Sequence, residues 1–435
     1  MNKYDLCFVG SGPSTIFGIL WLKEHNYKGN ILIIEQGQSL HKRPKTEPVI
    51  GFSGACGFSD FKLSSALDVG GIIPSLTAEQ LEKYEQWFIN TLNKYCEDNL
   101  EWQQTTEYNI PKGCNLTWNK HKTLHVGSDR GSELCKKIEN QFCTDPFITI
   151  KFEEEVLDVE KIKDIFIVST NKADYQSNKV IIATGRFGML ASKLATKFNF
   201  NQTPRPLQLG IRVKDITNTQ YEDIIKANYD FKFVKEYKFD NNVKVRVRTF
   251  CCNSSRAQIA IERNKQENYI SFNGHALHKG ETNPSVNYGI VAEATGLCSW
   301  YYKKENGSEL IRQINDTKEF ANNFDKEGNL GKGRKLLDDF SCIYNKNKAI
   351  RNIYPTEIKY ALTDFISELQ KVIDLSKARY YFPEWKASAS HPFVSDNGET
   401  ELSGLYYIGD CCLTGSIQKA VITSLMFCQS LVDKN

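Results

Sequence analysis

The sequence predicts an α/β protein in which a domain built on a parallel sheet is interrupted by an α+β domain built on an antiparallel sheet. Three segments predict the first domain: a strand, glycine turn, helix and strand at 4–35, a buried strand at 178–185, and a strand with an apolar helix at 405–431. From about residue 201 the pattern changes to alternating strands, hairpin turns and helices. We therefore expect residues 1–200 and 391–435 to form one discontinuous domain, with residues 201–390 inserted as a substrate or cap domain.

The first segment has the pattern of a Rossmann-like βαβ unit that binds a dinucleotide. Gly10 allows a sharp turn out of the first strand, and Gly12 allows the backbone to approach a pyrophosphate. The helix then begins at Pro13 and Ser14, where free N–H groups and the positive dipole end suit phosphates. The second strand ends at Glu35, an acid placed to accept ribose hydroxyls.

One position departs from this pattern. Thr15 stands where the fingerprint usually has Gly or Ala for close packing of helix on strand, and Gly18 offers a small residue one turn later. The alternative interpretation is an ordinary βαβ unit that binds no nucleotide. The intact order of strand, turn, helix, strand and acid favours the nucleotide.

The composition is that of a globular protein. Hydrophobic residues make up 40% of the chain and charged residues 25%, with a net charge of +3, which favours neither nucleic acid nor a strongly acidic partner. No apolar run approaches the ~20 residues of a membrane helix, and the first apolar segment is already the predicted strand. The 13 cysteines show no zinc-type spacing. We expect reduced thiols, no metal, no membrane association and a cytoplasmic protein.

Two loops beside the predicted nucleotide site carry candidate contacts. Gln36 and Arg43 lie in the polar stretch after the second strand, where a cation can face a phosphate or a pyrimidine edge. A solvated loop is the commoner outcome for such a charge run. In segment 51–65, small residues alternate with polar and aromatic ones, which is typical of a ligand-facing loop, with a surface loop as the alternative.

Two further strands end in residues that suit a ligand. Strand 178–185 ends in Ala-Thr-Gly at the carboxyl edge of the sheet, where ligands bind in open α/β folds. Strand 405–410 ends in Gly-Asp, and this acid can accept a hydroxyl of a ribityl chain. The N-terminus of the following helix can stabilise negative charge on a reduced isoalloxazine. The candidate contacts from these segments are Thr184, Gly185, Gly409, Asp410, Ser416 and Ile417.

Periodicity predicts the remaining elements. In the first domain we expect helices at 74–102, capped at Thr77, and at 130–142, and strands at 148–152, 154–159 and 164–170. In the inserted domain we expect a strand at 207–213, a hairpin joining 231–233 to 243–249, a strand pair at 256–262 and 268–272 that continues the sheet, and helices at 308–324 and 357–371. The polar face of the hairpin is basic and suits nucleic acid, but a solvated sheet face is the commoner outcome.

Together, these motifs resemble the FAD-binding domain of the glutathione-reductase-like flavoproteins. A narrower resemblance is to the FAD-dependent dehydrogenases described as NAD(FAD)-utilising. Segments 54–63, 209–213 and 248–251 are similar to that family's Gly-Ala-Gly-Thr-Phe-Ser-Asp-Gly-Lys-Leu, Ile-Gly-Val-Arg-Ile and Arg-Thr-Phe-Cys motifs. Ser59 and Lys62 are candidates to lie near the isoalloxazine, where a cation would stabilise the reduced anionic flavin, with a solvated or structural lysine as the alternative. The backbone of Val156 is a candidate contact to adenine. The chain departs from the family at 252–256, which lack the usual proline and glycines, and at Cys411-Cys412.

The leading hypothesis is an FAD-dependent oxidoreductase that passes a hydride between flavin N5 and an unidentified small molecule. No second Gly-x-Gly βαβ unit is evident, so NAD(P)H would dock transiently, or electrons would come from a protein or the substrate. The alternatives are a flavin-dependent enzyme that modifies RNA or peptides, and a non-enzymatic flavin-binding protein. A redox disulfide between Cys411 and Cys412 is a further hypothesis, and no catalytic residue is assigned. Candidate contacts for an anionic substrate are Arg212, Arg248, His275 and His278.

Overall fold

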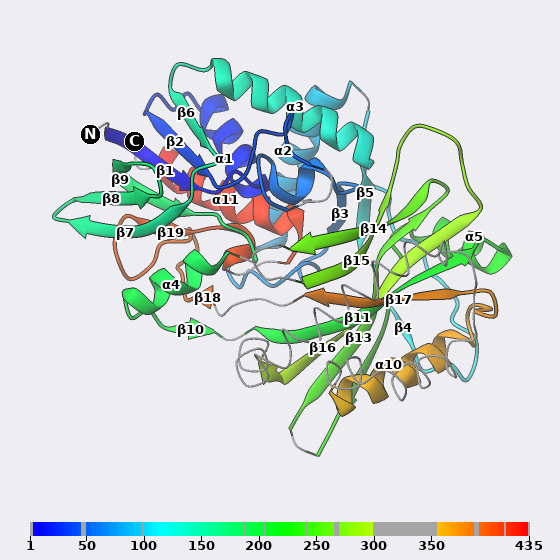
Figure 1. The fold of residues 1–435 in the computed structure, drawn as a ribbon. Helices are drawn as coiled ribbons and strands as arrows, with labels where there is room; N and C mark the ends of the chain where they lie inside the picture. The colour runs from blue at the N-terminus through cyan, green and yellow to red at the C-terminus, as the bar shows by residue number, and fades with distance from the viewer. Residues whose placement is uncertain are drawn as a thin grey trace. The chain divides into compact units, whose positions relative to one another are not determined.

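The computed structural model describes residues 3–44, 49–97, 99–186, 188–203, 205–240, 242–264, 269–298, 355–386, 391–412 and 415–433. Its contacts divide the chain into two compact units (Figure 1). Unit 1 comprises Met1–Trp102, Leu124–Thr203 and Ala389–Asn435, and unit 2 comprises Gln103–Thr123 and Pro204–Ser388. The sequence assigned 103–123 to the first domain, but this segment belongs to unit 2 because its strand β4 (Thr117–Trp118) extends the sheet of that unit.

Unit 1 is built on a sheet with the strand order β6-β2-β1-β9-β8-β7, in which β19 also pairs with β9 (Figure 1). The parallel strands are β1 (Lys3–Val9), β2 (Ile31–Glu35), β6 (Ile148–Phe152), β9 (Asp174–Ile182) and β19 (Leu405–Tyr407). Strands β7 (Val156–Ile162) and β8 (Ile165–Thr170) form an antiparallel meander with β9. The predicted Rossmann-like α/β fold is therefore confirmed, and the carboxyl ends of β1, β9 and β19 lie side by side.

Both faces of this sheet are covered. Successive side chains of a strand point to opposite faces, so Leu6 and Phe8 of β1 enter one core while Cys7 and Val9 enter another. The first core is completed by α1 (Pro13–Glu24), α2 (Ala78–Cys96), α3 (Ser128–Thr144) and α11 (Ile417–Val432). The second is completed by β7, β8 and α4 (Met189–Lys197). Such two-sided burial is typical of parallel sheets.

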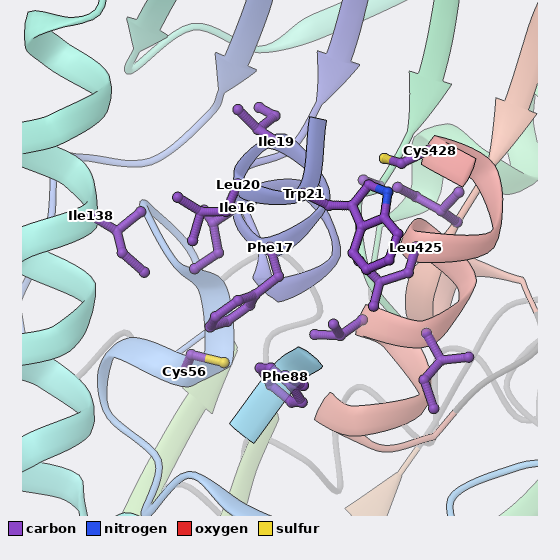
Figure 2. Packing of buried hydrophobic residues seen from close by; sticks show 14 of the residues in the cluster. Ile16, Phe17, Ile19, Leu20, Trp21, Cys56, Phe88, Ile138, Leu425 and Cys428 are labelled. Atoms are coloured by element: carbon purple, nitrogen blue, oxygen red, sulfur yellow. The ribbon is translucent and has the colours of Figure 1, made fainter. Parts of the chain in front are cut away.

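Helix α1 lies inside the first core and is buried from Ser14 to Leu22. Figure 2 shows Phe17 near Phe88 and Trp21 near Leu425 of α11. A Cβ at Gly18 would overlap Ser424 Oγ of α11. Gly18 is therefore the small residue that the sequence suggested. It allows close packing of α1 against helix α11, however, and not against a strand.

The shorter elements of unit 1 lie around this frame. Helix α2 begins after Thr77, whose side chain accepts a hydrogen bond from Gln80 N in a capping box, so the predicted cap is confirmed. The predicted helix at 130–142 is α3. The chain leaves unit 1 after β10 (Gln202–Thr203) and returns at β18 (His391–Pro392), and these strands pair antiparallel. The others are η1 (Gly54–Gly57), β3 (Lys62–Ser65), η2 (Gly409–Cys411) and β5 (Lys122–His125), in which the chain passes from unit 2 back to unit 1.

Unit 2 is built on an antiparallel sheet of order β17-β11-β16-β13-β12-β4. Its longer strands are β11 (Pro206–Ile216), β12 (Phe233–Lys238), β13 (Lys244–Ser254), β16 (Ser285–Cys298) and β17 (Arg379–Lys386). Helix α10 (Thr356–Leu369) packs on β13 and β16, and α5 (Thr219–Ala227) follows β11. The predicted sheet, the hairpin of β12 and β13 and the helix at 357–371 are confirmed. No described helix is long and apolar enough to span a membrane.

The predicted strand pair of unit 2 is confirmed, but its predicted place in the main sheet is wrong. Strands β14 (Ala257–Asn264) and β15 (Tyr269–Ala276) form a separate two-stranded sheet and do not continue the main one. The chain turns out of the main sheet at Ser255, which has a φ of 65° directly after β13. The predicted helix at 308–324 lies outside the described residues.

Glu368 fastens α10 to the segment at 103–123. Its carboxylate accepts hydrogen bonds from Asn115 N at 2.8 Å and from Lys371 Nζ at 3.0 Å, and Lys235 Nζ lies 3.7 Å away. The hydrogen bond from Asn115, opposed by burial and helped by the two lysines, lowers the pKa of Glu368 to about 2. The anionic form is therefore favoured by folding.

This lowered pKa predicts a loss of stability in acid. A group whose pKa is lower in the folded than in the unfolded state stabilises the protein above the unfolded pKa. That contribution is lost as the pH falls from about 5 to about 2. We expect Glu368→Gln to lower the melting temperature at neutral pH and to flatten its decline in acid, measured by calorimetry. A variant with the wild-type pH profile would show that Glu368 is not the titrating group.

Candidate functional site

Glycines bring the ends of three strands of unit 1 into contact. A Cβ at Gly10, after β1, would lie 2.6 Å from the main-chain oxygen of Ala183, after β9. A Cβ at Gly409, after β19, would lie 2.8 Å from Ser14 Oγ at the start of α1. Gly10 and Gly409 have φ angles of 101° and 75°, which favour glycine. The predicted motifs of β1, β9 and β19 therefore meet at one edge of the sheet.

Gly12 faces open space at this edge. A Cβ at Gly12 would have no protein atom within 4 Å, although its φ of −70° is open to any residue. No side chain caps α1, and Pro13 at its first position has no N–H. The first intrahelical bond runs from Ile16 N to Gly12 O, so the N–H groups of Ser14 and Thr15 precede the helical ladder. An uncapped helix end beside open space suits an anionic group.

The structure explains Thr15, which the fingerprint did not. Thr15 is fully buried, and its Oγ1 donates a hydrogen bond to Gly10 O at 2.8 Å. The threonine thus closes the turn between β1 and α1 with its own side chain. Its methyl group is buried with the rest of the helix.

The Glu35 carboxylate is bonded within the protein. It accepts hydrogen bonds from Ser11 N at 3.0 Å, Ser11 Oγ at 2.6 Å, Gly37 N at 2.8 Å and Gly51 N at 3.1 Å, and the residue is 5% exposed. A carboxylate has about four acceptor positions, and these bonds use them. Glu35 therefore ties the glycine turn to the Gly51 loop, and a ribose hydroxyl would bind it only in exchange for one of these bonds.

The Arg43 guanidinium also forms its hydrogen bonds within the protein. It is 6% exposed, and its Nη1 donates to Phe52 O and Gly54 O, each at 2.8 Å. Its guanidinium lies 4.9 Å from the ring centroid of Phe58. The predicted solvent- or phosphate-facing cation instead shapes the loop that brings Gly54 against Gly12. A Cβ at Gly54 would lie 3.1 Å from Gly12 Cα.

Two predicted contacts to the adenosine half lie near the end of β2. Gln36 follows Glu35 and is exposed. Val156 begins β7 and is 7% exposed. Glu154 N donates to Glu35 O at 3.0 Å, so the chain entering β7 runs beside the end of β2.

The predicted cation beside the isoalloxazine is neutralised within the protein. Lys62 Nζ lies 3.1 Å from Asp60 Oδ2, and both side chains are 5% exposed. His125 Nε2 lies 3.6 Å from the same oxygen. Ser59 Oγ accepts a hydrogen bond from Phe61 N. The sequence indicated Lys62 but missed its partners Asp60 and His125, because the pairing depends on how β3 and β5 pack.

The end of β9 offers a polar group without a partner. Thr184 Oγ1 is buried and makes no hydrogen bond within the described part of the chain. Gly185 follows with a φ of 69°, and a Cβ there would have no protein atom within 4 Å. Buried polar atoms are usually paired. The open space lies at Gly185, whereas a Cβ at Gly188 would lie 2.5 Å from Thr184 Oγ1. A polar group of a ligand at this strand end would complete the orphaned hydroxyl.

Asp410 is held by an arginine that the sequence analysis missed. Arg186 Nε and Nη2 donate to the two Asp410 oxygens at 3.1 and 3.3 Å. Arg186 directly follows the Ala-Thr-Gly strand end. This position beside a predicted ligand-binding strand end is the sequence signal that identifies Arg186 as a candidate site residue. Helix α11 begins close by at Ile417, and its cap Ser416 accepts a hydrogen bond from Lys419 N.

The vicinal cysteines after Asp410 form no disulfide in the structure and are buried. Cys411 Sγ lies 3.1 Å from Ile408 O, and Cys412 Sγ lies 3.2 Å from Gly409 O. Each thiol thus points to a main-chain carbonyl oxygen. Among the residues that the structure describes, no three His, Cys, Asp or Glu side chains gather in a potential metal site.

In unit 2, two arginines that were candidate contacts for an anionic substrate form ion pairs with carboxylates of the protein. Arg212 is fully buried, and its Nη2 lies 2.8 Å from Glu384 Oε1. Arg248 Nη1 lies 3.5 Å from Glu293 Oε2. Arg212 is therefore a core residue, which corrects the sequence interpretation. His275 lies in β15, and His278 follows that strand.

Comparisons with known proteins identify no activity for this chain. The family model for pyridine nucleotide-disulphide oxidoreductase matches residues 131–200, from α3 to just before β10. Comparison with curated proteins gave no match. Similar solved structures include glycine oxidase from Geobacillus kaustophilus, with 12% identity, coverage of 100% of this chain and 96% of that chain, and a TM-score of 0.44. Another is a putative FAD containing monooxygenase from Photorhabdus luminescens subsp. laumondii TTO1, with 10% identity, coverage of 99% and 89%, and a TM-score of 0.46.

Proposed function

We propose that the chain is an FAD-dependent oxidoreductase that binds FAD along the carboxyl edge of the unit 1 sheet. The observation that carries this proposal is the meeting of Gly10, Gly12 and the uncapped start of α1 with the ends of β9 and β19. The open space at Gly12 and the orphaned hydroxyl of Thr184 fit a polar ligand at the same edge. A dinucleotide that continues into a polyol needs this combination of phosphate and hydroxyl partners.

The residues of this edge take distinct roles in the proposal. Gly12, Pro13 and Ser14 receive the pyrophosphate, and the end of β2 with Gln36 and Val156 borders the adenosine. Thr184, Gly185, Gly409 and Asp410 border the ribityl chain, and Ser416 and Ile417 place the N-terminus of α11 toward the isoalloxazine. Bound FAD would supply hydride transfer at N5 to or from a small molecule. As part of the same proposal, the chain is similar to the NAD(FAD)-utilising dehydrogenases and acts in the cytoplasm.

The RNA-modifying alternative receives little support from the basic hairpin. Lys235 Nζ lies 2.6 Å from Asp364 Oδ2, and Arg246 Nε lies 4.0 Å from Glu236 Oε1. Together with the pairing of Arg248, these contacts place a carboxylate near three of the five basic side chains of β12 and β13; the other two are Lys238 and Lys244. Phosphate binding depends on clusters of basic side chains that carboxylates do not neutralise.

Anaerobic stopped-flow reduction tests the oxidoreductase assignment. We expect the FAD-loaded protein to be bleached by NADH or NADPH, or by a substrate found in a screen of small molecules. The control is free FAD at the same concentration. A flavin that stays oxidised with every donor would favour the non-enzymatic flavin-binding alternative.

A further inference from the structure

We infer that Cys251 of unit 2 is a modification site, at which hydrogen peroxide oxidises a reactive thiol to a sulfenic acid. The inference does not depend on bound flavin. It begins with the backbone of β13, whose pairing with β16 shifts register between Phe250 and Asn253, so that β13 has one extra residue there. Cys251 lies in this bulge with a φ of 49°. Bulges redirect side chains and occur often beside functional sites.

The two vicinal cysteines of β13 differ in exposure. Cys251 is half-buried, whereas Cys252 is 0% exposed and its Sγ lies 3.2 Å from Phe231 O. Oxidation of a thiol requires access for the oxidant as well as thiolate character. Cys251 is therefore the member of the pair that peroxide in solvent can reach.

The side chain of Arg212 places a cation beside Cys251. Its Nη2 lies 2.8 Å from Glu384 Oε1, and its Nη1 donates to Cys251 O at 2.9 Å. Its Nε is buried and has no hydrogen-bond partner among the described residues. The amide Nδ2 of Asn253 lies 3.9 Å from Cys251 Sγ, and Gly274 O lies 3.5 Å from the same sulfur. Donors from β11 and β13 thus gather around the thiol.

The charge of Arg212 and the Cys251 sulfur interact. Burial lowers the pKa of Arg212, but Glu384 and then Cys251 raise it, and the net shift is upward. Because Glu384 is held at Nη2, Nε remains as a donor for negative charge at Cys251. A guanidinium in this place stabilises the charge that the sulfur carries when it attacks a peroxide. The oxygen of the sulfenic acid then offers an acceptor to the same donors.

The oxidation balances with hydrogen peroxide as the only co-reactant. The thiol releases its proton, and the sulfur attacks one oxygen of the peroxide. An S–O bond forms and the O–O bond breaks, so the sulfur is oxidised by two electrons and the peroxide is reduced. The second oxygen leaves as hydroxide, which takes the proton and becomes water.

Dimedone labelling followed by mass spectrometry tests the inference. The full chain is treated with hydrogen peroxide, with no electron donor present, and dimedone traps each sulfenic acid. We expect Cys251 to be labelled at least about tenfold faster than Cys143, although Cys143 is more exposed. Burial and the charge of Glu139 raise the pKa of Cys143, which disfavours its thiolate. Denaturation should abolish the difference, because it removes both surroundings.

Cys252→Ser is the matched control for this experiment. It removes the adjacent thiol and should leave the labelling of Cys251 unchanged, whereas Cys251→Ser should lose the label. Labelling of Cys251 that is no faster than that of Cys143 would overturn the inference. The same holds for a label that Cys252→Ser loses, and for a difference in rate that persists in the denatured chain.

Discussion

Gly12→Val is expected to weaken FAD binding more than about 100-fold while the protein stays folded. The protein itself leaves room for the valine, because a Cβ at Gly12 meets no atom within 4 Å and the φ of −70° suits any residue. The added methyl groups would occupy the space in front of the N-terminus of α1, where the pyrophosphate is proposed to bind. Isothermal titration with FAD measures the loss, and the melting temperature should stay within about 2 °C.

Gly10→Ala is the matched comparison for this variant. Its Cβ would lie 2.6 Å from Ala183 O, and the φ of 101° strains any other residue. We expect Gly10→Ala to destabilise unit 1, whereas Gly12→Val should affect only ligand binding. FAD affinity that Gly12→Val leaves unchanged would place the pyrophosphate elsewhere.

Arg212→Met is expected to lower the free energy of unfolding of unit 2 by about 3–5 kcal/mol. Arg212 is fully buried, and its removal leaves Glu384, which is 3% exposed, without its cation. It also removes the Nη1 donor from Cys251 O at 2.9 Å, at a residue whose φ of 49° is strained. Chemical denaturation followed by circular dichroism measures the loss, and hydrogen exchange in β11 and β13 assigns it to unit 2.

The double variant Arg212→Met/Glu384→Leu serves as the control. Replacing both members of a buried ion pair by apolar residues removes the uncompensated charge, so the double variant should recover much of the lost stability. A loss below about 1 kcal/mol in Arg212→Met would contradict a core role for this arginine. It would reopen the interpretation of Arg212 as a contact for an anionic substrate.

The glycine positions and strand ends could be predicted because their signals are local. Gly10 and Gly409 follow apolar strands, and parallel pairing brings such ends to one edge of a sheet. The partners of charged side chains could not be predicted, because they depend on segments that meet only in the folded chain. Thus Lys62 was expected to be near a flavin and is paired with Asp60, and the pairing of Asp410 with Arg186 spans 224 residues.

The Rossmann-like fold could be predicted from the sequence, whereas the role of Glu35 at the end of β2 could not. The spacing between the glycine turn and Glu35 is a sequence property, whereas the four hydrogen bonds that Glu35 accepts come from two loops and a turn. In unit 2, alternation of polar and apolar residues identified β14 and β15 but not their sheet. The chain leaves the main sheet at Ser255, which has a positive φ, and nothing in the alternation pattern indicates this turn.

The central claim, FAD bound at the carboxyl edge of the unit 1 sheet, is tested most directly by the absorbance spectrum of the purified protein. Wild-type protein should carry flavin or take up added FAD at about one per chain, and acid release should yield intact FAD. Gly12→Val prepared in parallel should be colourless. Wild-type protein that is colourless and stays so after incubation with FAD would contradict the account.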